Sequence, residues 1–148
     1  MESRLSHTIV RKEKPDQADV LAIAAPLQQF NNENGPPANY SSLVLQVLNA
    51  EGNVTGGLFG KIAYDWLHIE FLVVPESLRG QGMGRALMQQ AESIALELGC
   101  TGIHLDTLAF QARGFYEKLG YTVFGTLDDF PKGGAHYFMS KRLAPLEL

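Results

Sequence analysis

Three glycines at alternate positions lie between two arginines in the stretch ESLRGQGMGRALMQQ: Gly80, Gly82 and Gly84 between Arg79 and Arg85. The first turn of a helix has backbone N–H groups without intrahelical partners, and together with the helix dipole they form a site for an anion. Glycine lets the backbone approach a bulky phosphate, and arginine adds charge-assisted hydrogen bonds. The stretch therefore predicts a phosphate or pyrophosphate site between a strand and a helix. A tight turn without a ligand is the alternative.

Two well-known phosphate-binding patterns do not fit this loop. The Walker pattern ends in Gly-Lys-Ser/Thr, which is absent here. The dinucleotide pattern G-x-G-x-x-G would need a glycine at the position of Arg85, and it expects the loop after the first strand of the fold. This loop follows roughly the fourth predicted strand, so a nucleotide-binding protein of either kind is excluded.

The elements that must position the loop are predicted from hydrophobic periodicity and from turn residues. Strands are expected at 6–13, on both sides of a turn at 50–53, and at 65–74, 101–108, 121–127 and 135–143; helices are expected at 16–35, 83–98 and 111–120. A meander followed by a β-α-β section predicts an α/β protein with a mixed sheet and helices on both faces.

Size and composition narrow the class of protein. The 148 residues suit one domain, 1–148, and 45% hydrophobic with 19% charged residues is typical of a globular protein. No apolar run approaches the roughly 20 residues that cross a bilayer, and no signal peptide is visible, so we expect a cytoplasmic protein that binds no membrane. The net charge of −4 argues against nucleic-acid binding. The one cysteine, Cys100, excludes an internal disulfide and a cysteine-based zinc cluster.

The stretch FLVVPESLRGQGMGRALMQQAESIALELGC resembles the coenzyme A motif of the GNAT superfamily of N-acetyltransferases, with Arg79, Gly82 and Gly84 meeting its Arg/Gln-x-x-Gly-x-Gly/Ala core. The later ARGFYEKLGYTVFG resembles the second signature of that family, and the order of elements agrees along nearly the whole chain. The resemblance implies a mixed sheet of about seven strands, with acetyl-CoA held where two central parallel strands, at 66–74 and 101–107, splay apart.

The resemblance also assigns residues to the coenzyme. The backbone from Arg79 to Arg85 would bind the pyrophosphate, and the strand end would pair with the pantetheine arm as an added strand. Tyr116 matches a tyrosine near the coenzyme sulfur, whereas Ala109 stands where many members have asparagine, so Phe110 and Gln111 are the substitutes. The expected coenzyme-binding residues are Leu72, Val73, Val74, Arg79, Gly80, Gln81, Gly82, Met83, Gly84, Arg85, Phe110 and Gln111.

Acetyl transfer to a primary amine requires a proton acceptor, because an amine with a pKa near 10 is only about one part in a thousand neutral at pH 7. The leaving thiolate benefits from an acid, which Tyr116 suits. Strict alternation in the strand 66–74 places His68, Glu70 and Leu72 on one face. The candidate bases are His68, Glu70 or a chain of waters. His104 and Asp106 form a polar pair on the next strand, where Asp106 would support the site through hydrogen bonds.

The acceptor side is expected to combine aromatic walls with carboxylates, which suits a cationic amine. The candidate contacts are Phe30, Tyr64, Trp66, Asp129 and His136. A small-molecule amine is favoured; a protein lysine or N-terminus, and a non-catalytic domain that binds acyl-CoA, are the alternatives. The scattered histidines predict no metal site, and the resemblance makes a homodimer an expectation.

Overall fold

A computed structural model describes residues 6–143, and the chain divides into two units, 1–37 and 38–148, which are described separately. The first unit contains helix α1 (Gln17–Asn34). Asp16 caps it: its carboxylate accepts from the Asp19 N–H, and the Asp19 carboxylate accepts from the Asp16 N–H, a reciprocal capping box. The helix predicted at this place is confirmed. The single domain 1–148 stays a prediction.

The strand predicted at 6–13 is wrong, because these residues form no strand in the structure. Their apolar side chains do not alternate: Ile9 and Val10 are adjacent, and both are exposed, at 101% and 75%. A strand needs a hydrogen-bonded neighbour, and within the described part of this unit the other regular element is α1.

The second unit contains a six-stranded mixed sheet in the order β1-β2-β3-β4-β6-β5. The strands are β1 (Ser41–Leu48), β2 (Val54–Ala63), β3 (Trp66–Val73), β4 (Gly102–Leu108), β5 (Thr122–Asp128) and β6 (Ala135–Arg142). The β3–β4 pair is parallel and the other pairs are antiparallel. The predicted fold class is confirmed, with six strands in place of about seven because 6–13 is not a strand.

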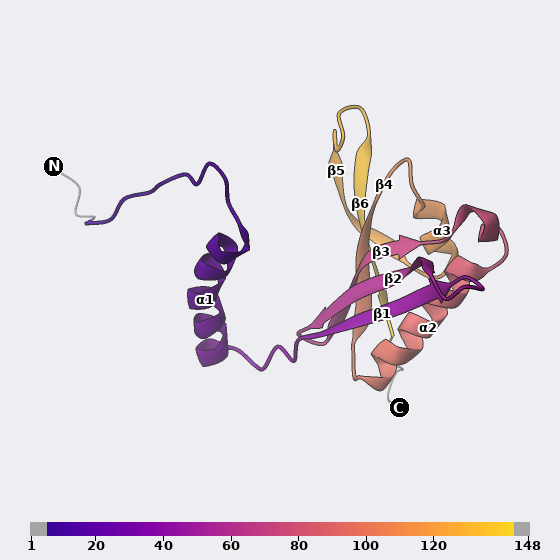
Figure 1. The fold of residues 1–148 in the computed structure, drawn as a ribbon, viewed down its shortest axis with the longest axis horizontal. Helices are drawn as coiled ribbons and strands as arrows, with labels where there is room; N and C mark the ends of the chain where they lie inside the picture. Colours follow the sequence, from indigo (N-terminus) through magenta and orange to yellow (C-terminus); the bar gives the residue numbers. More distant parts are fainter. Residues whose placement is uncertain (1–5, 144–148) are drawn as a thin grey trace. The chain divides into compact units, whose positions relative to one another are not determined.

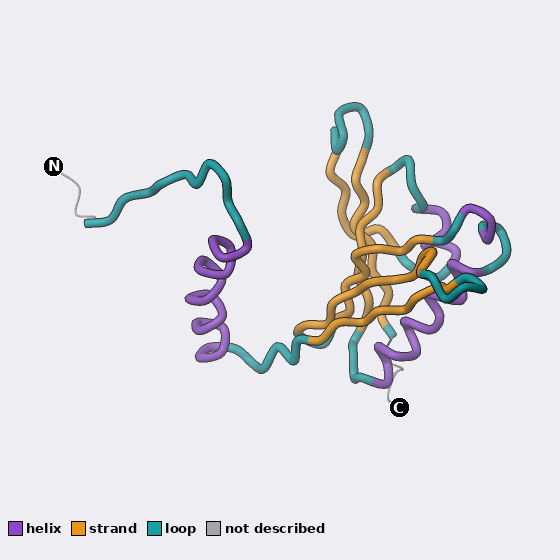
Figure 2. Tube along the Cα trace, viewed as in Figure 1, coloured by secondary structure: helices purple, strands orange, loops and turns teal. Residues whose placement is uncertain are grey.

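Helix α2 (Met83–Glu97) covers one face of this sheet and closes the core. Its buried residues are Leu87, Met88, Ala91 and Ala95, and they pack with Leu67, Ile69, Ile103 and Leu105 from the two parallel strands. Gly99, at φ +82°, follows its end, as expected for a helix stop. Figures 1 and 2 show α2 beside the sheet, with the short helix α3 (Arg113–Lys118) between β4 and β5.

The parallel strands β3 and β4 pair over only part of their length. Their pairing ends at Ile69 opposite Leu105, whereas β3 continues with β2 as far as Val73, and β4 continues with β6. In Figure 1 the two strands diverge beyond this point. The predicted splayed pair of central parallel strands is therefore present, and the edge of β3 that faces β4 is free of strand pairing from Glu70 onward.

A β-bulge in β3 changes which side chains face the core. The register of β2 with β3 shifts between Phe59 and Gly60, so the pairs Phe59–Phe71 and Gly60–Ile69 leave Glu70 as the extra residue. Phe71 is exposed and Leu72 packs against the core. The predicted alternation, with Leu72 on the face of His68 and Glu70, is wrong because the bulge inserts one residue and reverses the faces that follow it.

Candidate active site

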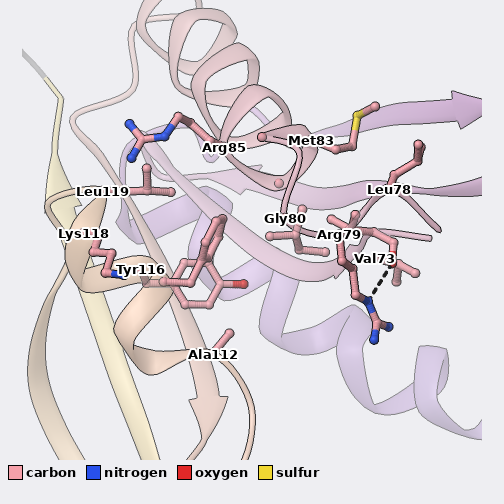
Figure 3. Close-up of a pocket in the computed structure, with 15 residues that line it drawn as sticks. Val73, Leu78, Arg79, Gly80, Met83, Arg85, Ala112, Tyr116, Lys118 and Leu119 are labelled. Atoms are coloured by element: carbon pink, nitrogen blue, oxygen red, sulfur yellow. Dashed lines mark hydrogen bonds between the residues drawn. The ribbon is translucent and has the colours of Figure 1, made fainter. Parts of the chain in front are cut away.

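A pocket of about 860 Å³ lies where β3 has separated from β4 (Figure 3). Three segments form it: the end of β3, the glycine loop with the start of α2, and α3 with the residues beside it. Its lining residues are Leu72, Val73, Val74, Leu78, Arg79, Gly80, Gly82, Met83, Gly84, Arg85, Ala112, Phe115, Tyr116, Lys118 and Leu119. A pocket of this size accommodates a cofactor-sized ligand.

The glycine loop has the left-handed backbone that the sequence predicted. Gly80 and Gly82 have φ of +77° and +85°, and no atom lies within 4 Å of a Cβ built on either one. Gly82 is the N-cap of α2, so the first N–H groups of this helix adjoin the pocket with no side-chain cap. A helix N-terminus that has no side-chain cap and lies beside a pocket favours the binding of an anion. Gly84 serves packing, because a Cβ there would lie 3.1 Å from Cζ of Phe115.

Two arginines lie on opposite sides of the pocket in Figure 3. Arg79 donates from Nε to the carbonyl oxygen of Val74 at 3.3 Å, which fastens the loop to the end of β3. Arg85 extends from the first turn of α2, and Lys118 adds a third cation from α3. The pocket therefore combines a helix N-terminus with three positive side chains, although the whole chain has a net charge of −4.

Tyr116 contributes an ionisable hydroxyl group to the same pocket. Its ring is buried in α3, edge-on to Phe115 and Tyr121. Burial, together with the negative charge of Asp106, raises the pKa of Tyr116 to about 12. Within residues 6–143 its hydroxyl has no hydrogen-bond partner, and Figure 3 shows the oxygen among the pocket residues. Tyr116 is thus a protonated phenol at neutral pH that can give its proton to a ligand.

A carboxylate between two imidazoles lies on the strands next to the pocket. Asp106 of β4 accepts from Nε2 of His136 at 2.7 Å and lies 3.3 Å from Nε2 of His68, using one oxygen for each ring. Burial alone would raise the pKa of Asp106, but the hydrogen bonds to His136 and His68 outweigh it and hold this pKa below its usual range. Asp106 is therefore ionised.

The second candidate base, Glu70, has a different partner. Its carboxylate lies 3.6 Å from Nζ of Lys61 on β2. His104 stacks on His68 with ring centroids 4.5 Å apart, and burial together with the charge of His68 lowers the pKa of His104. His104 is therefore a neutral ring that packs beside His68.

The structure brings most of the expected coenzyme residues to the pocket, but three stay outside its lining. Gln81 donates to the Ser77 carbonyl, Gln111 accepts from the Leu108 N–H and the Thr107 hydroxyl, and Phe110 is exposed. The first two stabilise the loops around the pocket. Sequence reasoning missed five lining residues: Leu78, Ala112, Phe115, Lys118 and Leu119. Four of them belong to the ARGFYEKLG segment, whose closeness to the glycine loop was the missing information.

The expected acceptor residues do not gather in one place. His136 and Phe130 pack edge-on at 4.3 Å, and Asp129 accepts from the Gly133 N–H in the same turn. Trp66 and Tyr64 lie at the other end of β3, about 20 Å along the strand from Leu72 by the usual rise per residue. Phe30 belongs to α1 and is exposed within the first unit. Contact of any of these with an acceptor stays a prediction.

Residues 6–143 contain neither a candidate metal site nor a candidate membrane span. No group of three or more metal-ligating side chains is arranged to hold a metal ion in this range. Nor is any helix between these limits long and apolar enough to cross a bilayer.

Comparison with known proteins gives consistent matches. The model of the acetyltransferase (GNAT) family matches residues 8–121. An acetyltransferase of Agrobacterium fabrum is 36% identical over 121 residues, 82% of this chain and 88% of that protein. A blasticidin-S acetyltransferase of Streptomyces morookaense is 39% identical over 93 residues, 62% of this chain and 68% of that protein. The crystal structure of an acetyltransferase from Bacillus cereus superposes with a TM-score of 0.80 at 36% identity, covering 90% of this chain and 98% of that one.

Proposed function

The chain belongs to the GNAT family of N-acetyltransferases, and from this premise we propose that it transfers the acetyl group of acetyl-CoA to a primary amine of a small molecule. The amine attacks the thioester directly, through a tetrahedral intermediate. The observation that carries the proposal is the separation of β3 from β4 after Ile69 and Leu105, which opens a pocket bounded by a left-handed glycine loop.

The donor half of the proposal rests on two features of the pocket. The backbone N–H groups of the loop 79–85, with Arg79 and Arg85, suit the pyrophosphate of the coenzyme. The edge of β3 at 72–74 has lost β4 as its partner, so its backbone groups are open to the amide groups of the pantetheine arm, in the manner of an added strand. A pantetheine arm on this edge would bring the thioester toward Glu70 and His68, since Leu72 lies about 13 Å along the strand from His68.

The chemical half of the proposal needs a base, a donor for the oxyanion and an acid. His68, Glu70 or a water accepts the proton of the amine. The backbone N–H near Val74 donates to the oxygen of the tetrahedral intermediate. Tyr116, whose raised pKa keeps it protonated, gives its proton to the departing thiolate of coenzyme A. The amine thus becomes an amide, and the thiol leaves as a neutral product.

A small-molecule acceptor is favoured by the relative from Streptomyces morookaense, whose name gives blasticidin S as its acceptor. The cluster of Phe130, His136 and Phe138 near Asp106 offers aromatic rings and a carboxylate, which suit a cationic amine. Transfer to a protein lysine or N-terminus is the second candidate acceptor class. A non-catalytic domain that binds acyl-CoA is the third function and predicts coenzyme binding without turnover.

The test is an acceptor screen with acetyl-CoA, in which free thiol release is followed with a thiol reagent and the products are identified by mass. The panel contains blasticidin S, amino sugars, polyamines, amino acids, and peptides with a free N-terminus or lysine. Turnover with a small amine that exceeds turnover with every peptide supports the proposal. Turnover confined to peptides moves the acceptor to proteins. Tight acetyl-CoA binding without acetylation of any amine refutes the catalytic function.

A further inference from the structure

We propose that Asp106 is a positioning residue that holds His68 as the base of the reaction, and that His136 is the anchor of Asp106. This inference rests on the proposed function and deepens it, because it selects one of three candidate proton acceptors. The three side chains come from strands that are neighbours in the sheet: His68 from β3, Asp106 from β4 and His136 from β6. Asp106 lies one residue beyond the last β3–β4 pair, Ile69–Leu105, and His68 lies one residue before that pair, next to the point where the sheet opens.

The hydrogen bonds fix the tautomers of both rings. An ionised carboxylate only accepts, so the ring nitrogens that face Asp106 must carry protons. His136 therefore donates from Nε2 to Oδ2 at 2.7 Å, and His68 donates from Nε2 to Oδ1 at 3.3 Å. In each ring the other nitrogen, Nδ1, is left with a lone pair unless the ring gains a second proton.

Burial then gives the two histidines different roles. His136 is 9% exposed, between Phe130 and Phe138, and its Nδ1 is buried with no partner among the described residues. A second proton on His136 would create a buried charged donor with nothing to accept it, which is more costly than a lone pair without a partner. His136 is thus a buried, fixed donor that holds Asp106 in place.

His68 is the member of the cluster that can exchange a proton with a substrate. Its side chain is 34% exposed, and its one hydrogen-bond partner within residues 6–143 is Asp106, through Nε2. Its ring plane is held by the parallel stack with His104 at 4.5 Å. Nδ1 of His68 is therefore a lone pair of fixed direction that is free to accept a proton, directly or through a water.

The other charged groups around His68 make poorer candidates for the same task. Lys61, opposite His68 on β2, is a donor, and its ammonium group lies 3.6 Å from the Glu70 carboxylate. Glu70 is thus neutralised by a partner on β2, and no residue within 6–143 other than Lys61 orients it. His104 is a neutral ring held by packing. His68 alone combines exposure with an orienting carboxylate.

The proton balance closes without any further reactant. As the amine nitrogen bonds to the acetyl carbon, its proton moves to Nδ1 of His68, and the positive imidazole is stabilised by the Asp106 carboxylate. The C–S bond breaks, and the thiolate takes the proton of Tyr116. The proton held by His68 returns through water to the Tyr116 phenolate, so one amine and one thioester give one amide and one thiol.

The first test compares Asp106→Asn, His68→Gln and the double variant, with Glu51→Gln as the control because it removes one carboxylate charge in an exposed turn. Asparagine offers one oxygen and one NH₂ group, so one of the two rings must change its tautomer. We expect each single variant to lower kcat by about 10²-fold, typical of a lost general base. The double variant should fall no further, with acetyl-CoA Kd and amine KM nearly unchanged.

The second test reads the tautomers directly by long-range ¹H–¹⁵N NMR on the full chain without ligand. The expected result is the Nε2–H form for His68 and His136 in the wild type, with a change at His68 in Asp106→Asn. An Nδ1–H form of His68 in the wild type overturns the inference, and this measurement needs no variant to fold.

Additive losses in the double variant overturn the inference as well, because they mean that Asp106 does not act through His68. An unchanged kcat in His68→Gln does the same. These failures occur in a wild-type protein that still acetylates its amine, which separates them from failure of the proposed function. A wild type that acetylates no amine refutes both.

Discussion

Replacing Gly82 tests whether the glycine loop binds the pyrophosphate. Gly82 has φ +85° and caps α2, and a built Cβ at this position meets nothing within 4 Å. Gly99, at the other end of α2, has φ +82° and the same open surroundings, but it lies outside the pocket lining. The two glycines are therefore a matched pair, alike in backbone strain and different in what their side chains would face.

The expected magnitudes follow from strain and charge. An alanine in the left-handed region costs about 1–2 kcal/mol, so Gly82→Ala and Gly99→Ala should lower the free energy of unfolding to a similar extent. An aspartate at 82 also places a negative charge beside the phosphates. Two like charges about 4 Å apart repel by about 1 kcal/mol in water and about 4 kcal/mol at a protein surface, which predicts a loss of acetyl-CoA affinity between about fivefold and about 10³-fold.

The assay is isothermal calorimetry with acetyl-CoA, alongside urea denaturation of the same samples. Gly99→Asp should bind acetyl-CoA as the wild type does, while Gly82→Asp should lose affinity, and raised salt should recover part of that loss because it screens the repulsion. Equal affinities in the two aspartate variants would refute the assignment of the loop to the pyrophosphate. So would a loss that is the same in Gly82→Ala as in Gly82→Asp, because it would come from strain alone.

Three further predictions concern the tyrosines and the ion pair near α2. Tyr116→Phe should lower kcat by about 10²-fold with little change in acetyl-CoA Kd. The control is Tyr121→Phe: Tyr121 is also buried but donates to Glu92, so this variant should lower stability and leave kcat unchanged. Equal losses of kcat in the two variants would refute the role of Tyr116 as the acid. The pKa of Tyr116 is raised to about 12 in the folded protein, whereas a tyrosine in the unfolded chain ionises near pH 10. The free energy of unfolding should therefore be steady below about pH 10 and fall above it, and this fall should be less steep in Tyr116→Phe. Urea melts at several pH values measure the effect. Glu92 accepts hydrogen bonds from Tyr121 at 2.9 Å and from Lys141 at 3.0 Å, and Glu92→Gln weakens this network. We expect a loss of about 1–3 kcal/mol in the free energy of unfolding, measured by thermal or urea melts, with acetyl-CoA affinity unchanged.

The regular elements were predictable wherever the local pattern is strong. Helix α2 follows from its apolar periodicity and from the glycine after its end, and the start of α1 follows from the Asp16 cap. The prediction of a strand at 6–13 was wrong because β-branched residues favour a strand only when a neighbouring strand is present to pair with them. Local propensity carries no information about whether that neighbour exists.

The coenzyme side of the site was more predictable than the catalytic side. The glycine loop is a local feature of backbone conformation, so the sequence carries it directly. The contact of Asp106 with His68 and His136 joins residues 38 and 30 positions apart. It depends on strand order and on the place where two strands stop pairing, neither of which is a local property. The sequence therefore predicted the residue types but left their partners open.

One glycine connects the bulge to the proposed base. Gly60 lies opposite Ile69, at the register shift that makes Glu70 the extra residue. A Cβ on Gly60 would lie 2.9 Å from the carbonyl oxygen of His68 and 2.8 Å from Cδ1 of Leu67, too close for any larger residue without a shift of the strand. Glycine inside a strand is a known sign of a bulge or of close backbone contact, so this was the signal that could have predicted the bulge. Because β3 is held against β2 at this point, His68 keeps its position one residue before the last β3–β4 pair. The close contact of Gly60 with the His68 backbone therefore helps to fix the imidazole that we propose as the base.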